Sequence, residues 1–308
     1  MTSGSAEPEG LVLVDKPPGI TSHDAVAMVR RALATRKVGH AGTLDPMATG
    51  LLVMGVGRAT RFLRFLGELP KTYEATMRLG VRTTTLDADG DVVSTAEVAV
   101  REAELAAAVA GLVGDSLQVP PAYSAVKVGG RKLYEAARRG ERLEAGARPV
   151  HVERFEVVAR RGDDVDVVVV CGGGTYVRVL AADVGDALGC GAHLTSLRRT
   201  RIGSFDVADA APPDGPPGLL PIARAVAHLP RVELEAEEAQ AAGHGRVLGP
   251  SGHRGAHAVF APDGELIGVW QDDGAKATPL VVLQRGPGDA ERRRPAPRPH
   301  TDYGAQDD

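Results

Sequence analysis

The sequence predicts an α+β fold on the basis of three observations. Apolar runs of strand length are mixed with amphipathic runs of helical length, without the regular strand–helix–strand order of a parallel sheet. Glycine pairs such as Gly129-Gly130 indicate hairpins between antiparallel strands. No internal repeat is present. We therefore expect a mixed, largely antiparallel sheet with helices, followed by a small β-rich domain at the C-terminal end.

The first elements follow from short-range patterns. Residues 11–15 are almost continuously apolar, which predicts a buried strand. Thr21 and Asp24 have the spacing of a helix-start signal. The apolar face of the following helix consists of Ala25, Met28, Val29, Ala32 and Leu33. A second apolar strand is expected at 51–56, and a short amphipathic helix at Arg58–Leu66.

The same patterns recur as far as residue 228. Strand-like runs occupy residues 72–79, 123–128, 150–159 and 164–171. Helical runs occupy residues 101–113, 131–139 and 175–188. Residues 211–221 are rich in proline and glycine, so they predict a linker, and a helix-like segment follows at Ile222–His228.

The C-terminal third predicts a small β-rich module and a tail. Short β-type runs lie at residues 256–261, 265–270 and 279–284. Residues 286–308 are rich in Pro, Arg and Asp and nearly lack apolar side chains, which is typical of disorder. The expected division is a main domain at 8–221, the β-rich module at 222–285 and a disordered tail at 286–308.

Composition indicates a soluble globular protein of the cytoplasm. The chain has 308 residues, of which 43% are hydrophobic and 25% charged. No apolar run reaches the length of a membrane helix, and the first residues lack the pattern of a signal peptide. The two cysteines, Cys171 and Cys190, are expected to be reduced thiols rather than a disulfide.

The distribution of charge indicates RNA binding, although the net charge of −4 argues against it. Residues 30–78 hold nine Lys or Arg against three acids, and residues 190–204 hold three Arg and no acid. Basic clusters of this kind suit a phosphate backbone, and a solvated surface is the alternative.

Residues 39–50 contain the strongest candidate for a reactive group. Asp45 is the only acid in this segment, among three glycines and a proline. Glycine and proline allow an unusual backbone conformation, and a single carboxylate presented by such a loop is a candidate nucleophile or general base. The alternative is a structural turn, since Asp-Pro is a common turn dipeptide.

Other motifs do not support cofactor or hydrolase chemistry. Gly172-Gly173-Gly174 follows a strand, but the third glycine of a dinucleotide fingerprint is replaced by Val177. No cysteine lies near the three C-terminal histidines, so a zinc site is not indicated at His244, His253 and His257. Ser124 and Ser196 lack the surroundings of an activated serine. We expect no cofactor and no metal.

Several longer blocks occur together in a fixed order. They are 11–22, the Asp45 loop, 71–73, 79–90, 121–127, 174–178 and 189–199. In this order they closely resemble the bacterial tRNA pseudouridine synthase family TruB. The resemblance implies a pseudouridine synthase fold, a PUA-like RNA-binding domain in the C-terminal position, and isomerisation of uridine 55 in the tRNA T-loop to pseudouridine.

The resemblance also implies roles for individual residues. Asp45 would be the catalytic carboxylate, Arg178 the cation that holds it through two hydrogen bonds and favours its charged form, and Tyr73 the stacking wall for uracil. Because the uridine must be extruded from a folded loop, His40 would enter the vacated space. Four further positions of the uracil pocket or its surroundings are Tyr176, Leu197, Lys16 and Lys127.

Two alternatives remain at this stage. One is a related synthase that acts on another RNA with a guide RNA and accessory subunits, and the other is an RNA-binding protein whose Asp45 loop is structural. The bacterial form of the blocks favours a monomer that acts on tRNA without an obligatory protein partner or a membrane. The sequence does not decide whether Asp45 attacks the ribose, attacks the base or abstracts a proton.

Overall fold

The computed structural model describes residues 7–283 except 138, 142, 144, 216 and 217. The described chain divides into two compact units, the first up to Val226 and the second from Ala227. This division lies five residues beyond the expected boundary at 221, because the short helix η3 (Ile222–Val226) packs on η1 (Gly57–Leu66) in the first unit. The tail for which we expect disorder, 286–308, lies outside the described residues.

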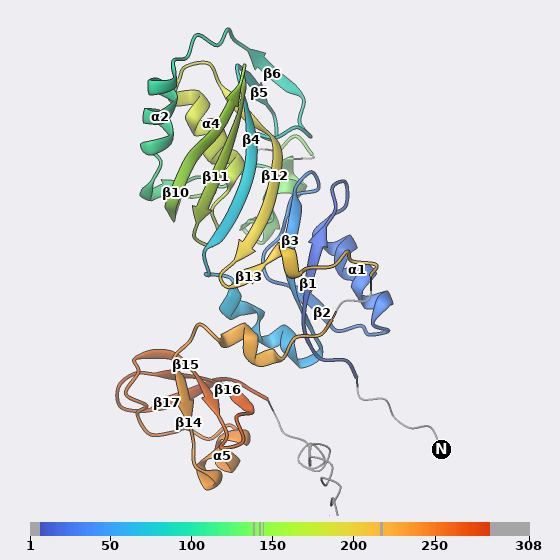
Figure 1. The fold of residues 1–308 in the computed structure, drawn as a ribbon, viewed down its shortest axis with the longest axis vertical. Coiled ribbons are helices and arrows are strands. Elements are labelled where there is room, and N and C mark those ends of the chain that lie inside the picture. Colours follow the sequence, from blue (N-terminus) through green and yellow to red (C-terminus); the bar gives the residue numbers. More distant parts are fainter. Residues whose placement is uncertain (1–6, 138, 142, 144, 216–217, 284–308) are drawn as a thin grey trace, which may run out of the picture. The chain divides into compact units, whose positions relative to one another are not determined.

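The first unit is built on one nine-stranded sheet (Figure 1). Its main order is β1-β3-β12-β4-β11-β10-β7, with β2 and β13 attached to β3 and β12. The strands are β1 (Gly10–Lys16), β2 (Val38–His40), β3 (Thr49–Val56), β4 (Lys71–Leu79), β7 (Gly114–Gln118), β10 (Arg148–Arg161), β11 (Asp164–Cys171), β12 (Ala192–Ile202) and β13 (Phe205–Asp206). Every pair is antiparallel except β3 with β12, which confirms the predicted α+β class.

Helices and two small hairpins complete this unit. The helices are α1 (Ser22–Ala32), α2 (Glu102–Ala110), α3 (Leu133–Ala137), α4 (Val177–Ala187) and the short η2 (Val207–Asp209). The hairpins are β5 (Val81–Thr83) with β6 (Val92–Thr95), and β8 (Lys127–Val128) with β9 (Arg131–Lys132). Figure 1 shows α2 and α4 beside the long strands β4, β10, β11 and β12. Apolar side chains of α2, α4 and these strands share one core with those of α1, β1 and β3.

Local signals explain several of these elements. The Thr21 hydroxyl accepts from the backbone N–H of Asp24, while the Asp24 carboxylate accepts from the backbone N–H of Thr21, so α1 begins as predicted. Gly129 and Gly130 both have positive φ at the β8–β9 turn, which confirms the predicted hairpin. Two predicted elements are longer than the observed ones. In the predicted strand 123–128 only β8 is a strand, and in the predicted helix 131–139 only α3 is a helix.

The second unit is small and β-rich, as predicted. Its four-stranded sheet has the order β14-β15-β16-β17, and α5 packs against β16. The elements are β14 (Arg231–Glu233), α5 (Ala236–Gly243), β15 (Gly255–Phe260), β16 (Leu266–Asp272) and β17 (Ala277–Val282). The core of this unit centres on the fully buried Trp270.

Candidate active site

The Asp45 loop connects β2 to β3 and is held by hydrogen bonds from a distant segment. The Ser22 hydroxyl, at the start of α1, accepts from the backbone N–H of Leu44 at 2.9 Å and lies 3.1 Å from the Leu44 carbonyl, to which it donates. Gly42 and Gly50 have φ of +93° and +100°, a region that favours glycine. The loop is therefore a fixed structure, and it leaves the Asp45 side chain 34% exposed.

Arg178 lies beside Asp45, as the sequence predicts. The Arg178 Nε atom is 3.3 Å from Asp45 Oδ2, and the Arg178 side chain is only 4% exposed. The two expected hydrogen bonds to Asp45 are not formed, because the terminal nitrogens of Arg178 have other partners. They donate to the carbonyls of Thr85 and Tyr123 at 3.1 and 2.7 Å. The guanidinium is thus held by three separate segments of the chain.

Asp87 is a second carboxylate on Arg178, and we did not single it out from the sequence. Its Oδ2 lies 3.5 Å from Arg178 Nη1, and the side chain is buried. The Thr85 hydroxyl and the backbone N–H of Asp89 donate to its other oxygen. Arg178 therefore lies between two carboxylates. The available signal was the position of Asp87 within the 79–90 block.

Arg178 favours the charged form of Asp45, as expected, but the net effect of the surroundings is to disfavour that form. Burial raises the pKa of the Asp45 carboxyl, and the Arg178 guanidinium only partly opposes this. Because the folded-state pKa is raised, the protonated form of Asp45 favours folding. That contribution is present below the ordinary pKa of an aspartate and is lost as pH rises through the raised pKa.

We expect the pH–rate profile to reflect this shift. If catalysis requires ionised Asp45, the single-turnover rate should begin to fall on the acidic side at a pH above the ordinary pKa of an aspartate, about 3.9. The measurement is the single-turnover rate at saturating enzyme from neutral pH down to the lowest pH at which the protein remains folded, with RNA binding followed in parallel. A rate that stays constant to the lowest pH at which the protein remains folded would contradict the shift.

Tyr73 lies on β4 and is 7% exposed. It is directly opposite Arg199 in the β4–β12 register. Burial is the main reason that the pKa of the Tyr73 hydroxyl is raised; Arg199 lowers it, and the nearby charge of Asp45 raises it further. The structure therefore brings Tyr73 near Asp45, with its hydroxyl protonated at neutral pH.

His40 ends β2, next to the Asp45 loop. Its ring meets the ring of His23 edge to face, with centroids 5.9 Å apart. Burial and the charge of His23 lower the pKa of His40, so its ring is neutral at pH 7. A neutral aromatic ring at this position is suited to stacking.

Tyr176 and Leu197 also lie in this region. The Tyr176 ring is 5.8 Å from the Arg178 guanidinium, and its backbone forms two hydrogen bonds with the Gln118 side chain. Leu197 is buried on β12 in the same core cluster as Tyr73. Tyr176 therefore lies beside Arg178, and Leu197 lies on the strand that pairs with the strand of Tyr73.

Lys16 and Lys127, which the resemblance places near the uracil pocket, lie in different surroundings. Lys16 is fully buried, and its ammonium donates to the carbonyls of Pro17, Ile20 and Pro46 at 2.9, 2.8 and 3.2 Å. Burial lowers the pKa of Lys16 to about 8. The hydrogen bond from the Lys16 ammonium to the Pro46 carbonyl holds the turn at Asp45-Pro46. Lys127 lies exposed on the β8–β9 hairpin, and among the described residues no hydrogen bond or ion pair joins its side chain to the other candidates.

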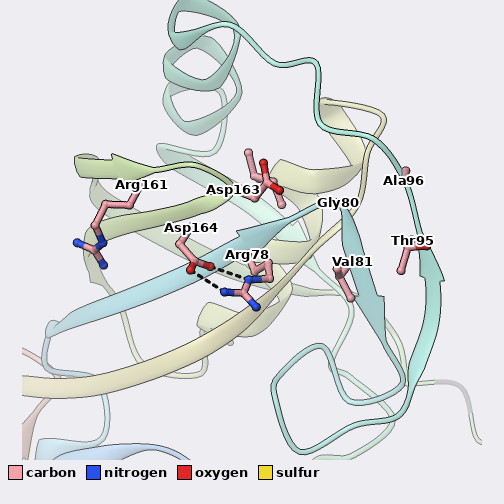
Figure 2. Close-up of a pocket in the computed structure, with 9 residues that line it drawn as sticks. Arg78, Gly80, Val81, Thr95, Ala96, Arg161, Asp163 and Asp164 are labelled. Atoms are coloured by element: carbon pink, nitrogen blue, oxygen red, sulfur yellow. Dashed lines mark hydrogen bonds and ion pairs between the residues drawn. The ribbon is translucent and has the colours of Figure 1, made fainter.

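A separate polar pocket of about 430 Å³ lies at the opposite end of β4 (Figure 2). Three of its charged side chains are already paired, since Arg78 donates to Asp164 at 2.8 and 2.6 Å and Arg161 forms an ion pair with Asp166. None of the predicted site residues lines it. Within the described ranges, no group of three or more His, Cys, Asp or Glu is placed to hold a metal ion. No helix found there is both long and apolar enough to cross a membrane.

Comparison with known proteins agrees with this architecture. The model of the TruB family pseudouridylate synthase N-terminal domain matches residues 30–177. A tRNA pseudouridylate synthase B C-terminal domain model matches residues 178–212, and a tRNA pseudouridine synthase II C-terminal model matches residues 229–284.

Relatives and solved structures match over most of the chain. The tRNA pseudouridine synthase B of Mycobacterium sp. (strain KMS) is 48% identical, with 92% of this chain and 98% of the relative covered. That of Nocardia farcinica (strain IFM 10152) is 50% identical, with 89% and 93% covered. A chain in the crystal structure of a Cbf5-Nop10-Gar1 complex has 29% identity and a TM-score of 0.67, with 89% and 84% covered. The chain therefore belongs to the TruB family of pseudouridylate synthases, which are isomerases.

Proposed function

We propose that this chain converts uridine 55 in the T-loop of tRNA to pseudouridine. The observation that carries the proposal is the buried Arg178 beside Asp45, with Tyr73 next to them, in a chain that belongs to this family. The names of its bacterial relatives support tRNA as the substrate. The basic clusters in residues 30–78 and 190–204 suit an RNA backbone.

The reaction breaks the bond between ribose C1′ and uracil N1 and forms a bond between C1′ and C5. The proton on C5 leaves, and N1 gains a proton, so no redox equivalent or cofactor is consumed. We assign the carboxylate step to Asp45, whether by attack on the ribose, attack on the base or abstraction of a proton. Arg178 would orient Asp45 and limit its protonation, while Tyr73 would stack on uracil and take part in loss of the C5 proton.

The target base must leave the folded T-loop before it can react. Flipping a base out of a stack costs roughly a few kcal/mol. The neutral His40 ring would offset part of this cost by stacking in the vacated space, and Tyr176 and Leu197 would line the uracil pocket. The second unit would act as a PUA-like RNA-binding domain that adds phosphate contacts.

A guide-dependent synthase is the competing function, because the similar solved chains include one from an archaeal box H/ACA sRNP Nop10-Cbf5 complex, with 27% identity. The identity to bacterial tRNA pseudouridine synthase B is greater, which supports a tRNA enzyme over the competing function. We propose that it acts in the cytoplasm as a monomer without an obligatory partner. Purification from native lysate distinguishes the two. A stable guide RNA and protein subunits in the product would favour the competing function.

The Tyr73 hydroxyl should matter for turnover more than for binding. Tyr73→Phe retains the aromatic wall, so we expect unchanged tRNA affinity and a single-turnover rate about 100-fold lower, or ~2.7 kcal/mol in barrier. Tyr73→Leu should in addition weaken binding. The control is Tyr134→Phe in α3, which should react at the wild-type rate. A near-normal rate for Tyr73→Phe would reduce Tyr73 to a packing residue.

The division of labour between the two units is also testable. All proposed site residues precede residue 200, so a chain ending at Val226 should keep the fold of the first unit. It should bind tRNA more weakly and with a shallower salt dependence, because fewer phosphates are contacted. The measurements are tRNA affinity at several salt concentrations and the single-turnover rate at saturating enzyme. A chain ending at residue 285 is the control and should match the full chain.

One outcome would contradict this division. If the chain ending at Val226 binds tRNA as tightly as the full chain and yet does not react, the second unit contributes to the chemistry itself.

A further inference from the structure

Arg199 is a buried cation that the proposed reaction does not yet use. It is 1% exposed, among the largest fully buried side chains of the described residues. In the part of the chain that the structure describes, no carboxylate forms an ion pair with Arg199. Burying a charge without a counter-charge is costly, and such arrangements are found preferentially at functional sites.

The strand register places Arg199 between the two segments that carry the proposed catalytic side chains. On one side, β12 pairs with β3, and Arg199 is opposite Gly50 at the end of the Asp45 loop. On the other side, β12 pairs with β4, and Arg199 is opposite Tyr73. A Cβ at Gly50 would lie 2.3 Å from the Arg199 carbonyl oxygen, so the glycine permits this close approach.

The Arg199 guanidinium donates to both ends of the loop. Its Nε donates to the carbonyl of Leu51 at 2.8 Å, and its Nη2 donates to the carbonyl of Gly42 at 3.0 Å. Asp45 lies between these two anchoring points in the sequence. Tyr73 lies opposite Arg199 in the strand register, and the guanidinium is close enough to lower the pKa of the Tyr73 hydroxyl. One side chain therefore holds both flanks of the Asp45 loop and lies beside Tyr73.

We propose that Arg199 is a positioning residue, which fixes the Asp45 loop and the Tyr73 hydroxyl relative to each other for the isomerisation. The inference rests on the proposed function. The fork of the guanidinium is needed, because two carbonyls on different segments must be reached from one rigid plane. Since no carboxylate competes for it, its charge also opposes the effect of burial on the pKa of Tyr73.

The neighbouring Lys71 does not duplicate this role. Its ammonium donates to the carbonyls of Gly67 and Leu69 at 2.7 and 2.8 Å, away from the loop. Burial, together with the charge of Arg199, lowers the pKa of Lys71 to about 8. Of these two buried cations, only Arg199 contacts the Asp45 loop through its hydrogen bonds.

The test compares Arg199→Lys and Arg199→Met with matched substitutions of Arg160. Arg160 is a suitable control because its guanidinium also donates to two backbone carbonyls, those of Val100 and Gly162, at 2.8 and 3.0 Å, on the far end of β10. Both pairs of variants leave carbonyls without donors, so both should unfold at lower temperature. The measurements are thermal unfolding, tRNA affinity and the single-turnover rate at saturating enzyme, well below each unfolding temperature.

For Arg199→Met we expect a single-turnover rate at least about 100-fold lower with tRNA affinity within threefold of the wild-type value. Arg199→Lys should recover part of that rate, and both Arg160 variants should react at the wild-type rate. If Arg199→Met does not fold, the test relies on Arg199→Lys, for which we expect a single-turnover rate about tenfold below the wild-type rate. Wild-type rates in the folded Arg199 variants would overturn the inference. An inactive wild-type protein would instead contradict the proposed function.

Discussion

Replacing Asp45 by Asn should abolish pseudouridine formation while tRNA still binds. Asparagine retains the volume and two polar atoms of the side chain, but it cannot act as a nucleophile or a base at neutral pH. We expect a fall in the single-turnover rate of at least about 1,000-fold, or ~4 kcal/mol in barrier. Burial already raises the pKa of the Asp45 carboxyl, so the loss of its negative charge should not destabilise the fold strongly.

The matched control is Asp164→Asn, which removes another ion-paired carboxylate at the opposite end of β4 and β11. It should react at the wild-type rate. Both variants are compared by single turnover at saturating enzyme and by tRNA affinity. If Asp45→Asn retains more than a tenth of the wild-type rate, the catalytic assignment of Asp45 is wrong, since the barrier would then have risen by less than ~1.4 kcal/mol.

Replacing Arg178 by Met should impair both activity and stability. Arg178 is buried between two carboxylates, so its removal leaves Asp45 and Asp87 without their cation. Breaking a buried pair from one side costs about 3–5 kcal/mol of unfolding free energy. The pKa of Asp45 should rise further, because the opposing charge is gone, and the acidic limb of the rate profile should move to higher pH.

A second substitution separates the two effects of Arg178. Asp87→Asn in the Arg178→Met background removes one of the two unpaired charges, so it should recover part of the stability. It should not recover the rate, because Asp45 still lacks its positioning cation. Denaturant unfolding and single-turnover rates of the single and double variants provide the measurement. Recovery of the rate along with the stability would mean that Arg178 serves only the fold.

The elements that the sequence predicted correctly are those with regular patterns. Alternation along β4 and β11 and the capping pair of α1 are local, so they can be recognised without the tertiary structure. The central strand β12 was missed. Its register shifts near Thr195 and Thr200 interrupt the alternation, and its three arginines resemble a solvated surface.

The site divides in a similar way. The resemblance pointed to Asp45, Tyr73 and Arg178, and the structure brings them together from three separate segments. The sequence could not show that the Lys16 ammonium donates its hydrogen bonds to backbone carbonyls, since carbonyl positions depend on the fold. Nor could it show that Arg199 alone among the β12 arginines is buried, because the two bulges decide which face each residue takes.

The central claim is that this chain, acting alone, isomerises one uridine of tRNA. The most direct measurement is site-resolved pseudouridine mapping after purified protein is incubated with an unmodified tRNA transcript, without guide RNA or added cofactor and with EDTA present. A transcript with cytidine at position 55 is the control. The account predicts pseudouridine at position 55 and at no other position of the first transcript, and none in the control. A transcript that is bound but unmodified, or modified only at another uridine, would contradict it.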